Sequence, residues 1–155
     1  MSDVKITGME ELTKTFQQLP DRLGRNAMRR ALRKGANVVR DAARKNANRI
    51  DDPATATSIA RNIAVSSGGS RREKRAGGPM MRVGVRGGAR FKKGDNGQPG
   101  GNTTYWRFVE FGTQQAEAQS FLRPAGEENV SAVLAAVSAD APKQIARELD
   151  RMKIK

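Results

Sequence analysis

The sequence contains neither cysteine nor histidine, and this absence removes several kinds of chemistry together. Without cysteine there are no disulfides and no thiol nucleophile. Without histidine, the chain lacks both the commonest general base and a usual zinc ligand. No set of nucleophile, base and metal can be assembled from the residues that remain, so we expect no enzyme, no metal site and no cofactor.

Long apolar runs are also missing. No stretch approaches the 18 or more apolar residues that span a bilayer. The first residues, Met1-Ser2-Asp3-Val4-Lys5, do not follow the basic and then apolar pattern of a signal peptide. We therefore expect no membrane partner and a protein that is made and assembled in the cytoplasm.

Large apolar residues are few for a chain of this length. Leu, Ile, Val and Phe account for 28 of 155 residues, beside a formal net charge of +13. This composition borders on that of disordered chains, yet the helical periodicities are too regular for disorder. We expect one domain over residues 1–155, with a thin core that depends partly on packing against other subunits.

The positive charge is unevenly distributed along the chain. Lys and Arg outnumber Asp and Glu by 12 to 5 in residues 1–49 and by 10 to 4 in residues 50–100, whereas residues 101–155 hold 7 of each. Such an asymmetry suggests that one side of the protein faces a polyanion while the neutral end packs.

The order of hydrophobic patterns predicts an α+β fold. A short strand at 4–7 and a helix over 9–19 are followed by a long helix over about 21–47, whose buried face is mostly alanine. Strands are predicted at 63–65 and 80–85. A C-terminal helix is predicted to begin near Ser120 or Arg123, with Pro124 in its first turn and a kink or restart near Pro142 capped by Asp140. We expect a small antiparallel sheet packed against the long basic helix and the C-terminal helix, with a flexible projecting hairpin.

Five arginines of the long helix fall within an arc of about 60°, opposite its apolar stripe. This arginine ridge consists of Arg22, Arg29, Arg33, Arg40 and Arg44. A solvated helix face explains it as well as a face turned toward DNA or an acidic partner. Because only Asp21 and Asp41 lie on the same helix, an external partner would explain the clustering of like charge.

Two segments are rich in glycine and basic residues and are predicted to be flexible loops, at about 66–79 and 87–102. Their basic residues are Arg71, Arg72, Lys74, Arg75, Lys92 and Lys93. No phosphate-binding loop pattern occurs in either segment. We expect these loops to become ordered against a neighbouring subunit.

The most specific pattern is aromatic. It runs Tyr-x-x-Phe-Val-Glu-Phe-Gly-Thr, then Phe-Leu-Arg-Pro-Ala, and comprises Tyr105, Phe108, Val109, Glu110, Phe111, Gly112, Thr113, Phe121, Leu122, Arg123, Pro124 and Ala125. We expect Tyr105, Phe108 and Phe111 to cover the sheet, Gly112 to turn with positive φ, and Glu110 to pair with Arg123 within the subunit or across an interface.

This block resembles the head–tail joining, tail-completion family of long-tailed, siphovirus-type bacteriophages. The resemblance implies a structural virion protein of the neck, forming a homo-oligomeric ring, a hexamer, at the head-proximal end of the tail. It also implies contacts with the tail terminator or tail tube protein and with the head–tail connector protein, and DNA passing through the ring without sequence preference.

A second interpretation rests on charge alone. The net charge of +13 and the arginine ridge are also compatible with a histone-like or ribosomal-type protein that binds nucleic acid without sequence preference. Ring formation distinguishes the two.

Overall fold

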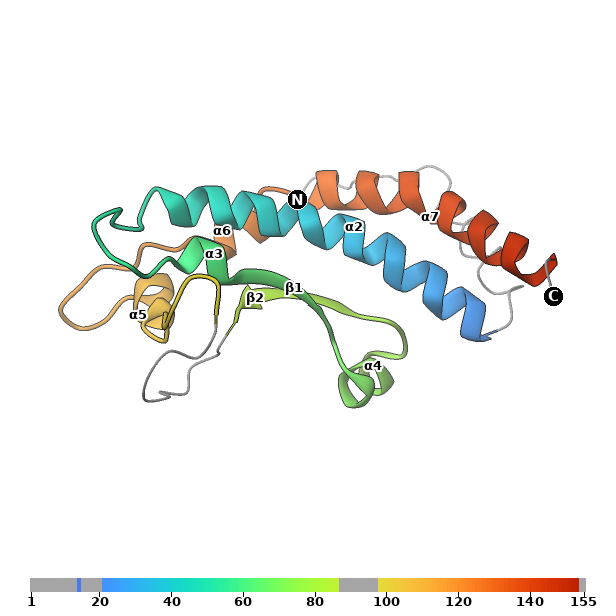
Figure 1. The fold of residues 1–155 in the computed structure, drawn as a ribbon, viewed down its shortest axis with the longest axis horizontal. Helices are drawn as coiled ribbons and strands as arrows, with labels where there is room; N and C mark the ends of the chain where they lie inside the picture. The colour runs from blue at the N-terminus through green and yellow to red at the C-terminus, as the bar shows by residue number, and fades with distance from the viewer. Residues whose placement is uncertain (1–13, 15–20, 87–97, 154–155) are drawn as a thin grey trace. The chain divides into compact units, whose positions relative to one another are not determined.

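A computed structural model describes residue 14, residues 21–86 and residues 98–153. Its elements are α2 (Asp21–Asn48), α3 (Ile59–Asn62), β1 (Ile63–Ser67), α4 (Ser70–Ala76), β2 (Met81–Val85), α5 (Trp106–Phe111), α6 (Leu122–Glu127) and α7 (Val130–Lys153) (Figure 1). The strand predicted at 4–7, the helix predicted over 9–19, and Lys92 and Lys93 lie outside the described residues.

The two strands form an antiparallel hairpin. The Gly68 amide donates to the Met80 carbonyl and the Arg86 amide to the Asn62 carbonyl, both at 2.8 Å, so one register extends past both ends of the sheet. Two strands combined with long helices confirm the predicted α+β class. No helix in the described part of the chain is long and apolar enough to cross a membrane.

The chain divides into two compact units. Unit 1 contains residues 1–36, 67–82 and 131–155, and unit 2 contains residues 37–66 and 83–130. Helix α2 and the hairpin each contribute to both units. In the described residues, unit 1 therefore holds the first half of α2, α4 and nearly all of α7, and unit 2 holds the second half of α2, α3, α5 and α6.

Unit 1 is built on close contact between two helices. Ala27 and Ala31 of α2 and Ala141 of α7 are fully buried. A Cβ added to Gly35 would lie 2.7 Å from Val137 Cγ2 and 3.2 Å from the Val133 carbonyl oxygen, so only glycine lets the helices approach this closely. The small residues predicted on this face of α2 allow the two helices to approach closely. Their contact takes the place of a large core in unit 1.

Unit 2 contains the larger hydrophobic core. Its buried members are Ala43, Ala47, Ile59, Ala60, Ile63, Phe121 and Ala125. Phe121 is the largest side chain among the described residues that is fully buried. Ala43 lies about 120° around α2 from Ala31 at 100° per residue, so α2 buries different sides in the two units.

Helix α7 continues through Pro142, and the predicted restart is wrong. Asp140 lies within the helix and accepts a hydrogen bond from Gln144 Nε2 at 2.9 Å instead of capping a second segment. Ala141 and Ile145 on either side of the proline are buried in unit 1. Packing of these neighbours offsets the loss of one backbone hydrogen bond at the proline.

Both predicted loops contain more order than their compositions indicate. Residues 70–76 form helix α4, which ends at Gly77 in the left-handed conformation (φ 74°). In the second segment, residues 98–102 are held to a buried polar side chain. Asn62 accepts from the Gly100 amide at 2.8 Å and donates to the Gly101 carbonyl at 2.9 Å. Residues 70–76 are thus helical where a loop was predicted, and Gly100 and Gly101 are hydrogen-bonded to Asn62, while the flexibility of both segments stays a prediction.

Candidate functional site

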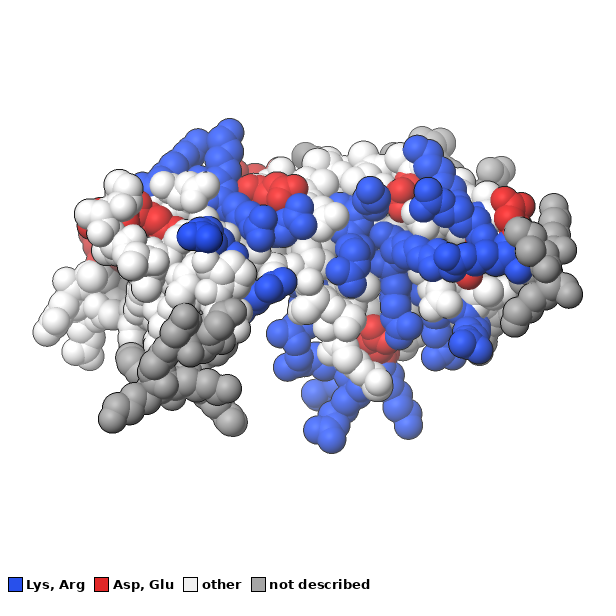
Figure 2. Space-filling model, in the orientation of Figure 1, with Lys and Arg blue, Asp and Glu red and all other residues white. Residues whose placement is uncertain are grey.

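The two units differ sharply in charge. Residues 21–36, 67–82 and 131–153 of unit 1 hold 15 Lys and Arg against 5 Asp and Glu. The described residues of unit 2 hold 8 against 7. Figure 2 shows basic side chains gathered over the first half of α2 and over α4. The net charge of the chain is thus largely a property of unit 1.

Ten basic residues on two elements form what we call the basic surface. It consists of Arg22, Arg25, Arg29, Arg30, Arg33 and Lys34 of α2, and Arg71, Arg72, Lys74 and Arg75 of α4. All except Arg29 and Arg30 are exposed. The basic residues of the first predicted loop and three members of the predicted ridge therefore belong to unit 1.

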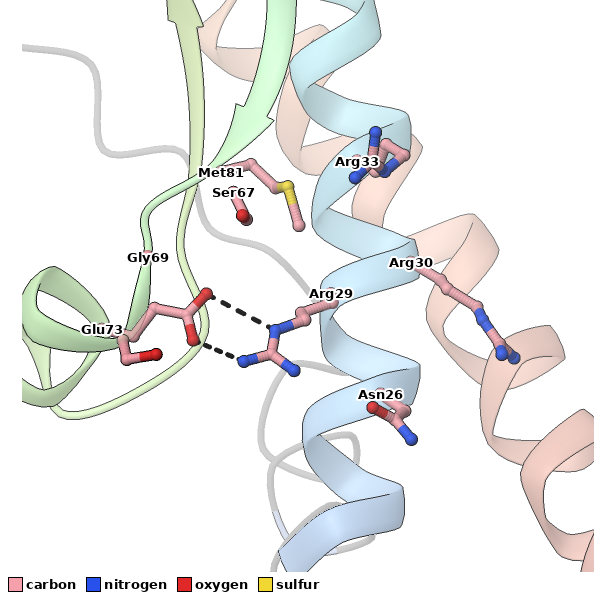
Figure 3. A pocket seen from close by; sticks show the side chains of 9 residues that line it. Asn26, Arg29, Arg30, Arg33, Ser67, Gly69, Glu73 and Met81 are labelled. Carbon is pink, nitrogen blue, oxygen red and sulfur yellow. Dashed lines mark hydrogen bonds and ion pairs between the residues drawn. The ribbon is translucent and has the colours of Figure 1, made fainter.

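An ion pair joins the two elements of this surface. The Arg29 guanidinium donates to both carboxylate oxygens of Glu73, with Nη2 2.5 Å from Oε2 and Nε 3.4 Å from Oε1 (Figure 3). Hydrogen bonding to Arg29, together with the Arg29 charge, lowers the pKa of Glu73 below its usual 4.5. The same contact raises the pKa of Arg29. Glu73 is the one carboxylate on α4, so it is an internal counter-ion within a basic cluster.

An open depression of about 490 Å³ lies beside this ion pair. Its lining includes Arg29, Arg30 and Arg33 of α2, with Ser67, Ser70 and Glu73 from the end of the hairpin. Figure 3 shows Arg29 directed toward Glu73 and Arg30 directed toward α7. Arg30 Nη1 there lies 2.5 Å from Oε1 of Glu148, whose side chain is nearly buried. The depression is basic and polar, and its described residues offer no paired carboxylates for acid–base chemistry.

The ion pair is expected to hold α4 in place, because α4 buries no residue and a seven-residue helix is marginal alone. We predict that Glu73→Gln increases the rate of trypsin cleavage after Arg71, Arg72, Lys74 or Arg75 several-fold at neutral pH. The matched variant Glu117→Gln removes one exposed charge from unit 2 and should leave the rate unchanged. Equal rates in both variants and the wild type would contradict the assigned role.

The pH dependence of this contact follows from the same shift. Because the folded pKa of Glu73 lies below 4.5, the stabilisation is fully present above about pH 4.5 and is lost as the pH falls through the lowered value. The side-chain carboxyl carbon signal of Glu73 in a ¹³C NMR titration should therefore show a midpoint below pH 4.5.

The other two ridge arginines lie in unit 2 and make local contacts. Arg40 pairs with Asp41 (2.8 Å), which raises the pKa of Arg40. Arg44 donates twice to the Ile63 carbonyl, at 2.8 and 3.1 Å. The prediction that the ridge lies opposite the core along the whole helix is wrong here, because in unit 2 α2 buries the side next to these arginines.

The aromatic block forms α5 and the turn into α6, with an orientation opposite to the one predicted. Tyr105 is 37% exposed, and Phe108 and Phe111 are each 60% exposed. Trp106 and Val109 pack against the core instead. The expectation that Tyr105, Phe108 and Phe111 cover the sheet is therefore wrong. They form an exposed aromatic face, three residues apart along one short helix.

Glu110 has a structural role that the sequence pattern did not reveal. Its carboxylate is 2% exposed and accepts the backbone amides of Phe121 (2.8 Å), Leu122 (3.0 Å) and Arg123 (3.0 Å). It thus caps α6 from another element of the chain. The predicted ion pair with Arg123 is replaced by a bond to the Arg123 backbone.

The remaining block residues shape the connection between α5 and α6. Gly112 has a φ of 74°, which confirms the predicted turn. The Thr113 hydroxyl accepts the Gln115 and Ala116 amides at 3.2 and 3.1 Å. Pro124 lies in the first turn of α6, as expected. Within the described ranges, no group of three or more acidic residues is arranged to hold a metal ion.

Comparison with known proteins gives one finding. The model of a protein family described as "Bacteriophage HK97-gp10, putative tail-component" matches residues 10–112. The match covers two thirds of the chain, from the segment before α2 through α5 to Gly112, and leaves out α6 and α7. No curated protein and no solved structure matches the chain.

Proposed function

Since the chain belongs to the HK97 gp10-like family of phage tail components, we propose that it forms a homo-oligomeric ring, a hexamer, at the head-proximal end of the tail. The ring joins the tail terminator or tail tube protein to the head–tail connector protein, and the phage DNA passes through it. The role is structural and not catalytic, and it is carried out in the virion after assembly in the host cytoplasm.

The observation that carries this proposal is the exposed aromatic face of α5. Aromatic side chains contribute most of the energy at protein interfaces, yet Phe108 and Phe111 leave 60% of their surface in water. Helix α5 is held against the core of unit 2, because Trp106 and Val109 pack there. A rigid helix that presents aromatic residues is a preorganised contact surface.

A second copy of the same chain is the occupant we assign to this face. Contacts through unit 1 would bring together two surfaces with a large excess of positive charge, and such contacts are unfavourable. Unit 2 is nearly neutral in its described residues, so copies can approach there without that repulsion. Heterologous contacts between identical subunits close into rings when the rotation allows.

The test is the mass of the purified protein in solution. We expect the wild type to form a closed oligomer, and Phe108→Ser with Phe111→Ser to dissociate it, with the dissociation constant rising at least about tenfold for each side chain removed. The control pair, Val130→Ser with Leu149→Ser, removes other exposed apolar groups and should leave the mass unchanged. Light scattering after gel filtration measures both.

A monomeric wild type at micromolar concentration, or equal dissociation by the control pair, would overturn the assignment of this face. Circular dichroism of the double variant should remain that of the wild type, because neither phenylalanine belongs to the buried core of unit 2.

A further inference from the structure

We propose that the basic surface of unit 1 is a binding site for the phosphate backbone of duplex DNA, formed jointly by the first half of α2 and by α4. The proposal deepens the function above, on which it rests only for the identity of the polyanion. It differs from the arginine ridge in excluding Arg40 and Arg44. It also includes the four cations of α4 and three further basic residues of α2, which are Arg25, Arg30 and Lys34.

The charge distribution of the basic surface favours an anionic partner. Eight of the ten basic residues are exposed, and the carboxylate on α4 is already engaged by Arg29. Arg30 is similarly paired with Glu148. These two internal pairs neutralise Arg29 and Arg30. The eight exposed residues still give this surface a local excess of positive charge. Like charges crowded in this way repel, and an external anion removes the repulsion.

The surface lacks what an acidic protein partner would need. Protein interfaces have an apolar centre within a polar rim. In the described part of the chain, the exposed large apolar residues are Tyr105, Phe108, Phe111, Val130 and Leu149. None of them lies on the first half of α2 or on α4. A polar and strongly positive surface without apolar anchors is typical of contacts with a nucleic-acid backbone.

The residue types and their support also fit phosphate. Eight of the ten are arginine, whose planar fork binds phosphate oxygens through two hydrogen bonds. The Arg29–Glu73 pair fixes α4 against α2, so both rows of cations are positioned before a ligand arrives. Phosphate contacts carry no sequence information, and binding here is therefore independent of sequence.

The test is binding of a fluorescent 30-base-pair duplex of random sequence to the full chain over a range of salt concentrations. The key variant is Arg71→Gln with Arg72→Gln and Arg75→Gln, three exposed positions on α4. The matched control is Lys45→Gln with Arg49→Gln and Arg61→Gln, which removes the same charge from exposed positions of unit 2.

We expect the wild type to bind the duplex, with affinity falling steeply as salt rises. The α4 variant should lose up to about 0.9 in the slope of log affinity against log salt for each phosphate contact removed, and at least about tenfold in affinity near 0.1 M salt. The control should change this slope by less than about 0.9, the value for one phosphate contact. A second duplex of unrelated sequence should bind with the same affinity.

Three results would overturn the proposal. The first is that the wild type does not bind the duplex at about 0.05–0.1 M salt. The second is that the α4 variant and the control weaken duplex binding equally. The third is that the α4 variant still binds DNA but no longer binds an acidic tail or head protein. Failure of ring formation in the mass measurement leaves this result unaffected, because the duplex is offered to the purified chain, so the two proposals can fail separately.

Discussion

Replacing Phe121 with alanine should destabilise unit 2 by about 3–5 kcal/mol, the cost of deleting a fully buried aromatic ring. Phe121 is the largest member of a core whose other buried residues are mainly alanine and isoleucine. The small neighbours cannot fill the cavity, since their side chains are too short. A typical domain is stable by only about 5–15 kcal/mol, so much of the folded state should be lost.

Urea denaturation followed by circular dichroism measures this effect. Phe108→Ala is the matched control, because it is the same substitution at a 60% exposed position of the same unit. The control should shift the midpoint by little, whereas Phe121→Ala should move it far to lower urea. Similar shifts for the two variants would show that Phe121 is not the centre of the core.

Replacing Glu110 with alanine should destabilise unit 2 by about 2–4 kcal/mol, although the sequence predicted only an ion pair with Arg123 at this position. The substitution leaves three backbone amides, those of Phe121, Leu122 and Arg123, without their acceptor. An unsatisfied buried amide costs about 1–3 kcal/mol, and the Phe121 amide is buried. The effect should therefore exceed that of losing an ordinary helix cap.

The same urea experiment separates this role from a simple charge effect. Glu117→Ala removes an exposed carboxylate from the same unit and should be nearly neutral. Glu110→Gln retains one acceptor oxygen and should fall between the wild type and the alanine variant. A neutral Glu110→Ala would mean that the α6 amides find other acceptors.

The helices and strands were predictable because each hydrophobic pattern keeps one period along its segment. The long helix was predicted over 21–47 and is observed over Asp21–Asn48, and both strands lie within two residues of their predicted bounds. The predicted alanine face of the long helix contains Ala27 and Ala31, and both are fully buried. These features depend on local periodicity and side-chain size, which a single sequence carries.

The missed features depend on contacts between distant segments. Helix α4 contacts Arg29 through Glu73, 44 residues away, and glycines on both sides of this segment indicated a loop. The orientation of α5 depends on which face meets the core, and aromatic residues on one side with Trp106 and Val109 on the other left that choice open. The cap by Glu110 likewise has no local pattern.

The central claim is that this tail component assembles with itself and with the tail, using the neutral unit 2 for protein contacts. Negative-stain electron microscopy of the purified protein, alone and mixed with tail tubes of its phage, tests this most directly. We expect closed rings of the protein alone and a single ring at one end of each tube, and we expect both to be lost in the Phe108→Ser, Phe111→Ser variant. Single subunits that leave tube ends bare would contradict it.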